Sequence, residues 1–508
     1  MADLVVGSGP SGVSVASGLL ARGRQVIMLD VGKRLEPENV ARRDRMAAGT
    51  PEGWSAADRA AWQAGQAEAP PGGVRRYGSD FAMEPADATF AEGAEAFHLR
   101  ASAAAGGLSN LWGSALLPYR AADMAGWPVS ADDLAPHYRA ITDFLPVSGA
   151  GDALEALFPA LPMAGRTPLP LGPQARAFLG RYRTAAGPDV GATLGLARQA
   201  VAPGCRACGQ CLHGCPWRLI WSAEQRLADL CALPGFSYRP GAPVRRFAEG
   251  PAGVTLTLAD GATVAGERAF LAAGVLESAR VLLASQPAGG ALTLLDSQHG
   301  FLPAVARRAA PTRPDRLPLH TLAQLFLELD DPAISPYLVH AQIYGWNEFY
   351  AADLIRSYGR RLPGSAPLWR VLARRLMVAQ VFLHSDHSAR AELTLAPDGR
   401  LRARVTPPAD QPARFRAAAR RVGASLARGG LVPLAFAARV NPPGSSFHAG
   451  GTVPMARSPR PGQSDRLGRP HGLSRLHLAD ASVLPAIPAT TITLPVMANA
   501  HRIATETP

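Results

Sequence analysis

The sequence predicts an α/β protein with two domains, one a Rossmann-like domain on a parallel sheet and the other an α+β domain built on an antiparallel sheet. Three observations support this fold class. A β-branched strand, a glycine-rich loop and a helix open the chain, in the order found where a dinucleotide-binding parallel sheet begins. Segments with period-two hydrophobicity recur between residues 322 and 405, as in antiparallel sheets. The 508 residues exceed the roughly 100–200 of a single domain.

The composition excludes several classes of protein. With 47% hydrophobic and 18% charged residues, the chain is neither disordered nor a coiled coil, and no apolar run approaches the roughly 20 residues that cross a bilayer. The net charge is +12, but only one of the 52 cationic residues is a lysine, Lys33, and no basic block is interleaved with aromatic residues. We therefore expect no nucleic-acid binding. Because no signal-peptide pattern opens the chain, we expect a cytoplasmic location, unless a partner subunit exports the protein.

The N-terminal loop has the spacing of a dinucleotide-binding turn. The strand Leu4–Val6 precedes Gly7, Gly9 and Gly12 in a G-x-G-x-x-G pattern, a helix follows, and Asp30 ends the next strand. The first glycine permits the tight turn, the second lets the backbone approach a pyrophosphate, and the third lets helix and strand pack closely. Asp30 is placed to accept hydrogen bonds from a ribose. The pattern alone does not choose between FAD and NAD.

Further elements follow in order along the chain. A second glycine-rich loop spans residues 106–113, and Ser130 with two following acids predicts the start of a helix within 125–144. Residues 253–271 alternate as in a hairpin that leads into Ala273, Gly274 and a helix through Leu283. The segments 322–329, 339–344, 378–383 and 391–405 predict one separate antiparallel sheet, and residues 412–428 predict a helix.

The helical region 351–376 is rich in arginine, including Arg356, Arg360, Arg361 and Arg370. A membrane-surface patch or a groove for an acidic substrate fits this pattern. A solvated helix face packed on the sheet fits it too and is the simpler interpretation, so membrane association stays open.

Four of the five cysteines lie within eleven residues. Cys205, Cys208, Cys211 and Cys215, followed by Pro216, read C-x2-C-x2-C-x3-C-P, the spacing of bacterial ferredoxins. We expect a 4Fe-4S cluster, or a 3Fe-4S cluster if Cys215 is not a ligand. Zinc and a metal-free relic are the alternatives, although structural zinc sites usually have pairs separated by a longer loop. The fifth cysteine, Cys231, is expected to be a buried free thiol.

The C-terminal block completes a recognisable order of motifs. Ser445–Thr452 precedes Asp465–Arg469, Leu476–Pro485 and a final helix, and 126–128 reads Gly-Trp-Pro. This order resembles the glucose–methanol–choline (GMC) oxidoreductases, which are FAD-dependent enzymes acting on alcohols. The cysteine motif is similar to that of a sugar and polyol dehydrogenase branch. The resemblance implies an FAD-binding Rossmann-like domain and an α+β substrate domain on an antiparallel sheet.

The resemblance also implies roles for individual residues. His448 matches the active-site histidine that acts as general base toward the substrate hydroxyl while hydride passes to the flavin. The cofactor-binding positions, together with those of the first loop, are Gly107, Asn110, Trp112, Gly113, Val244, Ala273, Gly274, Asp480, Ala481 and Thr493. The helix after Thr493 is expected to direct its positive end toward the flavin.

One position departs from the family pattern. The family usually pairs its first histidine with a second His or Asn, and counting back from the final helix places Thr491 there. A hydroxyl can hydrogen-bond a substrate oxygen but cannot take up a proton at pH 7. An altered or lost oxidation activity therefore stays open.

These expectations combine into one domain plan and one function. The FAD-binding part consists of three segments: 1–125 with a cofactor-covering loop, 196–300 with the cysteines 205–215, and 441–508 with the active-site histidine. The substrate part consists of a helical segment at 126–195 and the substrate domain at 301–440.

The expected reaction is oxidation of an alcohol, on a carbohydrate or sugar-like molecule, with electrons passing through an iron–sulfur cluster to an external acceptor. The alternatives are a sterol or hydrophobic-alcohol oxidase using O₂, and a flavoprotein with structural cofactors and no net oxidation.

Overall fold

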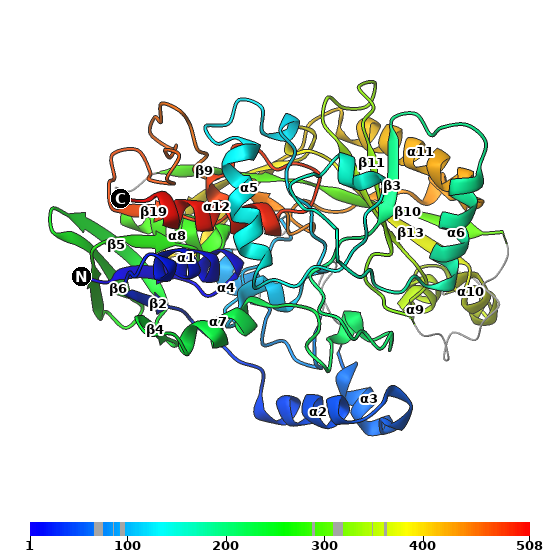
Figure 1. The fold of residues 1–508 in the computed structure, drawn as a ribbon, viewed down its shortest axis with the longest axis horizontal. Coiled ribbons are helices and arrows are strands. Elements are labelled where there is room, and N and C mark those ends of the chain that lie inside the picture. Colours follow the sequence, from blue (N-terminus) through cyan, green and yellow to red (C-terminus); the bar gives the residue numbers. More distant parts are fainter. Residues whose placement is uncertain are drawn as a thin grey trace.

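The computed structural model describes residues 1–65, 75–84, 86–91, 97–286, 290–307, 319–347, 349–359 and 363–508. A parallel sheet and its helices occupy one half of the molecule, and a large antiparallel sheet occupies the other (Figure 1). Within these described ranges, no helix is long and apolar enough to span a membrane. The mixed α/β fold class is confirmed, whereas the predicted domain limits stay a prediction.

The parallel sheet collects strands from distant regions of the chain. Its order is β19 (Leu476–Leu478), β8 (Ala269–Leu271), β1 (Asp3–Val6), β2 (Val26–Leu29) and β4 (Phe236–Arg239). Val6 pairs with Leu29 on one side and Leu271 on the other, and Leu478 pairs with Leu271. Four strands therefore end together at one edge, which is where open α/β sheets bind ligands.

Helices cover this sheet. They are α1 (Pro10–Ala21), α7 (Ala223–Cys231), α8 (Val275–Ser285) and α12 (Thr493–Glu506), and α5 (Ala131–Thr142) packs on α12. Gly18 of α1 lets α12 pack closely, because a Cβ there would lie 3.0 Å from the Cβ of Ala504. The start of α5 is as predicted, with Ser130 and Asp133 forming a capping box.

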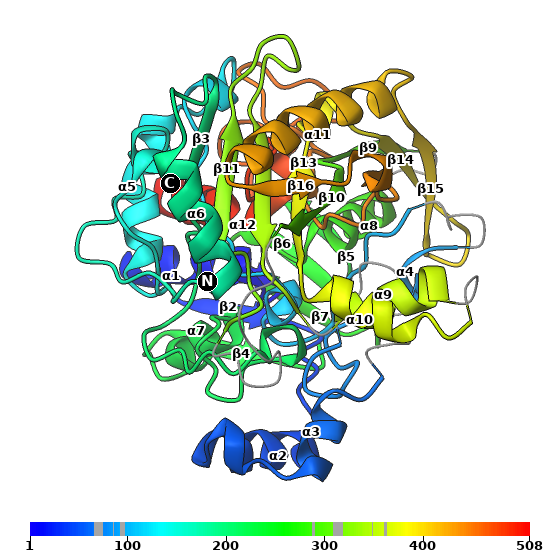
Figure 2. The same cartoon turned by 90° about the vertical axis from the view of Figure 1, so that its right-hand side faces the viewer.

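The large antiparallel sheet has the order β16 (Leu431–Pro433), β10 (His299–Ala306), β13 (Leu376–Phe382), β12 (Val339–Tyr344), β11 (Leu325–Leu329) and β3 (Ala192–Leu196), with β17 (Arg439–Val440) also on β10. Alternate residues such as Leu302, Ala379 and Ile343 pack as one apolar core with α6 (Pro173–Thr184) and α11 (Gln411–Arg428). Figure 2 shows α11 lying across this sheet. The residues between them in sequence point to the opposite face.

The prediction of a single antiparallel sheet from four segments is wrong in one respect. Residues 391–405 form the hairpin β14 (Arg390–Leu395) and β15 (Leu401–Thr406), which pairs instead with β9 (Ala291–Asp296) and β18 (Ala449–Gly450). Likewise β5 (Val244–Gly250), β6 (Gly253–Leu258) and β7 (Thr263–Gly266) make the expected hairpin, but the next strand, β8, joins the parallel sheet. Period-two alternation identifies a strand but not its partner.

Two helices form an arm that lies apart from both halves in Figures 1 and 2. They are α2 (Pro37–Ala48) and α3 (Ala56–Trp62). The arm packs on the cysteine loop, where Trp54 stacks on Trp217 at 5.6 Å between ring centroids, and the Trp217 indole N–H donates to the Ala47 carbonyl. The remaining described helices are α4 (Ala86–Thr89), α9 (Phe349–Tyr358) and α10 (Ala366–Ala373). Arg360 and Arg361 of the arginine-rich region lie outside the described residues.

Candidate active site

A cavity of about 1030 Å³ opens at the carboxyl ends of β1, β8 and β19 and extends to the polar face of the large antiparallel sheet. Residues from the β1–α1 loop, the β8–α8 loop and the segment after β19 line one end of it. Residues of β10, β12 and β13 line the other. The cavity therefore has a glycine-rich end suited to a nucleotide and a side-chain-rich end suited to a second molecule.

The β1–α1 loop has the geometry that its spacing predicts. A Cβ at Gly7 would lie 2.6 Å from the Ala272 carbonyl oxygen, and one at Gly12 would collide with the Gly7 carbonyl. A Cβ at Gly9 would meet no atom within 4 Å, and Gly9 caps α1, whose first turn holds no acidic side chain. Backbone N–H groups of α1 therefore face open space at the positive end of a helix dipole.

Asp30 closes this end of the cavity from β2. Its carboxylate accepts hydrogen bonds from the hydroxyls of Ser8 and Tyr238, the latter at 3.0 Å, and Ser8 in turn accepts from the Gly106 N–H at 2.9 Å. Burial raises the pKa of Asp30 to about 6, against the lowering effect of these hydrogen bonds. The carboxylate is thereby tied to both glycine-rich loops.

Two more helices begin at the cavity. Gly274, with a φ of +83°, caps the start of α8, and α12 starts at Thr493. The first turn of α12 holds no acidic side chain, whereas that of α8 holds Glu277, which pairs with Arg280. Asp480 caps the turn after β19 by accepting from the Ser482 N–H at 2.9 Å, and it accepts from the Ser278 hydroxyl at 2.5 Å. Burial raises the pKa of Asp480. Its carboxylate is thus engaged in joining the β19 end to α8.

His448 lies half-buried at the cavity wall. Its ring stacks on Phe382 with centroids 4.9 Å apart, and its Nδ1 has no hydrogen-bond partner among the described residues. Burial, and after it the nearby His299 and His340, lower the pKa of His448 to about 3. The imidazole is therefore neutral at pH 7 and can accept a proton.

The loop that carries His448 is anchored by one buried carboxylate. Asp296 accepts from the Gly444 N–H at 2.7 Å and from the Ser446 hydroxyl at 2.8 Å, while Ser446 Oγ accepts from the His448 N–H. Phe447, between them, has a φ of +59°, a left-handed conformation that is rare outside glycine and that clusters at functional sites.

The cavity floor is a set of side chains on neighbouring strands. Gln342 of β12 pairs with Gln380 of β13, which pairs with Phe301 of β10, and the next row holds Tyr344. The Tyr344 hydroxyl donates to Gln342 Oε1 at 2.7 Å and lies 3.2 Å from Gln380 Oε1. Sequence reasoning did not single out these residues. The polar positions within the apolar alternation of each strand are the signal that could have identified them.

Most predicted site residues line this one cavity. They are His448, Thr491, Gly7, Gly9, Asp30, Gly107, Trp112, Gly113, Val244, Ala273, Gly274, Asp480, Ala481 and Thr493. Gly12 supports the loop from behind, and Asn110 lies behind the second glycine-rich loop, where its amide donates to the Ala105 and Gly107 carbonyls at 2.9 Å. Their functional roles stay predictions.

Thr491 also lines the cavity, and its hydroxyl oxygen accepts a hydrogen bond from the Leu117 N–H at 2.7 Å. The hydroxyl proton is left to donate elsewhere. Thr491 can therefore orient a substrate oxygen but, as expected, does not add a second base.

Comparison with known proteins agrees with this geometry. Residues 396–500 match the family model described as GMC oxidoreductase. This C-terminal part of the chain is therefore similar to the GMC oxidoreductases. The crystal structure of pyridoxine 4-oxidase from Mesorbium loti is similar in fold, with a TM-score of 0.58 and 17% identity over 99% of this chain and 98% of that one. No curated protein matched the chain.

The residues around this cavity fit FAD, the cofactor expected for GMC oxidoreductases. The open space at Gly9 and the N-termini of α1, α8 and α12 suit the phosphates, and Asp30 suits a ribose hydroxyl. The unpartnered Nδ1 of His448 lies at the wall of the same cavity.

The cysteine loop lies against the cavity wall. Cys211 Sγ accepts from the Thr321 N–H at 3.4 Å, and both Thr321 and Leu212 line the cavity. Burial raises the pKa of Cys205 to about 11 and that of Cys208 to about 12, with neighbouring thiols adding to both shifts. Over the described ranges, no group of three or more His, Cys, Asp or Glu side chains is placed to hold a metal ion.

The remaining cysteine corrects a prediction. Cys231 is exposed, not buried. Cys231 is the last residue of α7, whose buried face consists of Ala223, Leu227 and Leu230. Because Cys231 comes one position after Leu230, the helical rotation of about 100° per residue directs its side chain to solvent.

Proposed function

We propose that this protein is a GMC oxidoreductase that catalyses the FAD-dependent oxidation of an alcohol group. The observation that carries the proposal is the placement of a neutral His448 at the wall of the cavity whose other end has the glycine loops of a dinucleotide site. FAD, when bound, supplies the two-electron oxidant. His448 takes the hydroxyl proton of the alcohol, and removing that proton makes the carbon-bound hydride easier to release.

Neighbouring side chains hold the base and the alcohol in place. Stacking on Phe382 and the Asp296-anchored loop restrict the His448 ring. Thr491, with its oxygen fixed by Leu117, can donate to the substrate oxygen. The residual proton on His448 returns to solvent after the product leaves.

We propose a carbohydrate or sugar-like alcohol as the substrate class. The amides of Gln342 and Gln380 beside the rings of Phe301 and Phe382 support this choice, because sugars are bound by hydrogen bonds to their hydroxyls and by apolar contact with their ring faces. A sterol needs a floor with fewer polar groups, so the sterol oxidase alternative is less well supported.

The test is anaerobic reduction of the purified holoenzyme. We expect sugar alcohols or aminosugars to bleach the flavin absorbance near roughly 450 nm, a property of flavins. Sterols serve as the hydrophobic comparison. A flavin that no alcohol of either class reduces would overturn the oxidation proposal and favour a protein with structural cofactors.

We further propose that the enzyme acts as a dehydrogenase with an iron–sulfur cluster at the four cysteines. Their ferredoxin-like spacing and the position of Leu212 in the cavity wall support this. As they lie here, the thiols do not converge into a ligand set, so no electron step is assigned to them. Iron and acid-labile sulfide analysis of anaerobically purified protein, beside a Cys208→Ser, Cys211→Ser variant, tests it. Iron that is lacking in the wild type, or equal in the variant, contradicts the cluster.

A further inference from the structure

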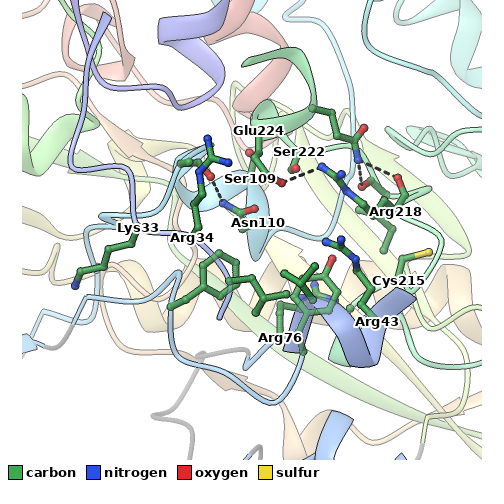
Figure 3. A pocket seen from close by; sticks show the side chains of 18 of the residues that line it. Lys33, Arg34, Arg43, Arg76, Ser109, Asn110, Cys215, Arg218, Ser222 and Glu224 are labelled. Atoms are coloured by element: carbon green, nitrogen blue, oxygen red, sulfur yellow. Dashed lines mark hydrogen bonds and ion pairs between the residues drawn. The ribbon is translucent and has the colours of Figure 1, made fainter. Parts of the chain in front are cut away.

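A second pocket lies beside the glycine-rich loop 106–113, and Figure 3 shows Ser109 and Asn110 of this loop among the side chains that line it. Its volume is about 220 Å³, enough for a small molecule. Three side chains, Arg76, Ser109 and Trp112, line both spaces and form the wall between them. The pocket is therefore separate from the proposed FAD and substrate sites but adjacent to them.

The lining of this pocket is strongly cationic. The charged groups in it are Lys33, Arg34, Arg43, Arg76 and Arg218 against a single carboxylate, Glu224. Three of the cations already have partners, since Lys33 pairs with Glu84, Arg43 with Asp44 and Arg218 with Glu224. Arg34 and Arg76 form no ion pair with any residue that the structure describes. Neither guanidinium has a carboxylate partner: Arg34 is exposed, and the ionisable groups close to Arg76 are the Tyr77 hydroxyl and the thiols of Cys211 and Cys215, the last of which also lines this pocket.

Arg76 is the more unusual of the two because it is buried, with 3% of its surface exposed. Its Nη2 donates to the Leu111 and Trp112 carbonyls at 3.2 Å. Its Nε and Nη1 are buried and have no partner among the described residues. A buried guanidinium normally has an anion and a full set of acceptors. The unused N–H groups therefore indicate a missing acceptor.

We propose that this pocket binds a small molecule through an oxyanion group, a phosphate or carboxylate, held between Arg76 and Arg34. A guanidinium presents its N–H groups as a fork that matches two oxygens of such a group. The rings of Tyr77, Phe81 and Trp112 provide apolar walls for the rest of the ligand. Trp112 then lies in contact with both the bound anion and the FAD cavity.

The test is calorimetric titration of the holoenzyme with potassium phosphate and, separately, with succinate, each at constant ionic strength adjusted with chloride. We expect saturable binding of at least one of the two, and the stronger titrant identifies the oxyanion class. Arg34→Gln leaves the buried arginine intact and should weaken binding about tenfold, as for loss of one charge-assisted contact. Arg76→Gln should abolish it.

The matched control is Arg416→Gln, which removes the same charge from the exposed face of α11, far from this pocket. It should bind as the wild type does. The proposal would be overturned if neither anion gave a saturable heat of binding. It would also be overturned if Arg34→Gln and Arg416→Gln weakened binding equally, because the effect would then reflect the net charge of the protein and not a specific site. The assay contains no alcohol, so its failure leaves the proposed oxidation untouched, and a failure of oxidation leaves this site untouched.

Discussion

His448 shows how burial sets the protonation state of a single residue. An exposed histidine is partly protonated near pH 6.5 and is then no base. Here burial lowers the pKa to about 3, and stacking on Phe382 supplies a rigid ring contact in place of a hydrogen bond. Thr491 is predicted to stand at the place of the second His or Asn that the family usually has, and its oxygen accepts a hydrogen bond from the Leu117 N–H. The proposed proton transfer therefore rests on one base.

We predict that His448→Gln slows anaerobic flavin reduction by about 10²–10⁴-fold, the usual contribution of a general base. Flavin content, read from absorbance, should be unchanged. Because the pKa of His448 is depressed, the wild-type reduction rate should stay level from pH 8 to 5 and fall only as the pH approaches about 3. Stopped-flow measurement across that range checks this, and a rate that falls with an apparent pKa near 6.5 contradicts it.

At the scale of elements, the cofactor end of the cavity is made by the N-termini of three helices. Helices α1, α8 and α12 each begin where the chain leaves the parallel sheet or the segment after it, so their free N–H groups gather at one edge. The glycines that permit this have different tasks. Gly12 lets α1 pack on its own loop, whereas Gly9 keeps space open in the cavity.

We predict opposite outcomes for alanine at these two glycines. Gly9→Ala should fold normally, since its φ of −64° suits alanine and no atom lies near the new methyl group, but FAD affinity should fall tenfold or more because that methyl enters the phosphate space. Gly12→Ala should be destabilised even without FAD, because its methyl collides with the Gly7 carbonyl. Thermal unfolding of the apoprotein and fluorescence titration with FAD separate the two effects. Equal behaviour of both variants would refute this division of roles.

At the scale of the whole molecule, the two sheets enclose many histidines away from water. His299, His320 and His477 are at most 3% exposed, and burial lowers the pKa of His299 to about 3 and those of His320 and His477 to about 4. Each binds a proton more readily in the unfolded chain. Asp30 and Asp296 act in the opposite sense, since burial raises both pKa values to about 6.

We predict that the protein loses stability as the pH falls below 6.5. Between pH 6.5 and about 4 the unfolded state takes up more histidine protons than the folded state does, so the free energy of unfolding decreases. At pH 5 each buried histidine lowers it by up to about 2 kcal/mol, and each of the two aspartates restores about 1 kcal/mol. Urea unfolding at pH 7.5 and 5 measures the change. His477→Gln should show a smaller pH dependence, and an unfolding free energy that rises toward pH 5 would exclude the mechanism.

The sequence by itself determined the features that depend on near neighbours in the chain. The turn at Gly7–Gly12, the capping box at Ser130 and the period-two strands follow from backbone sterics and local hydrogen bonds, and the structure has each of them. Adjacent motifs likewise singled out His448, which lines the large cavity, while its catalytic role stays a prediction.

Only the tertiary structure decided which distant segments meet. Strand pairing depends on packing between residues that lie far apart in the sequence. Residues 391–405 therefore pair with β9 and not with the large sheet, and β8 pairs with β1 in the parallel sheet and not with the preceding hairpin. The same holds for the amides of Gln342 and Gln380 on the cavity floor and for the unpaired charge of Arg76. A side chain's burial and its lack of a partner are properties of everything packed around it, and no local pattern encodes them.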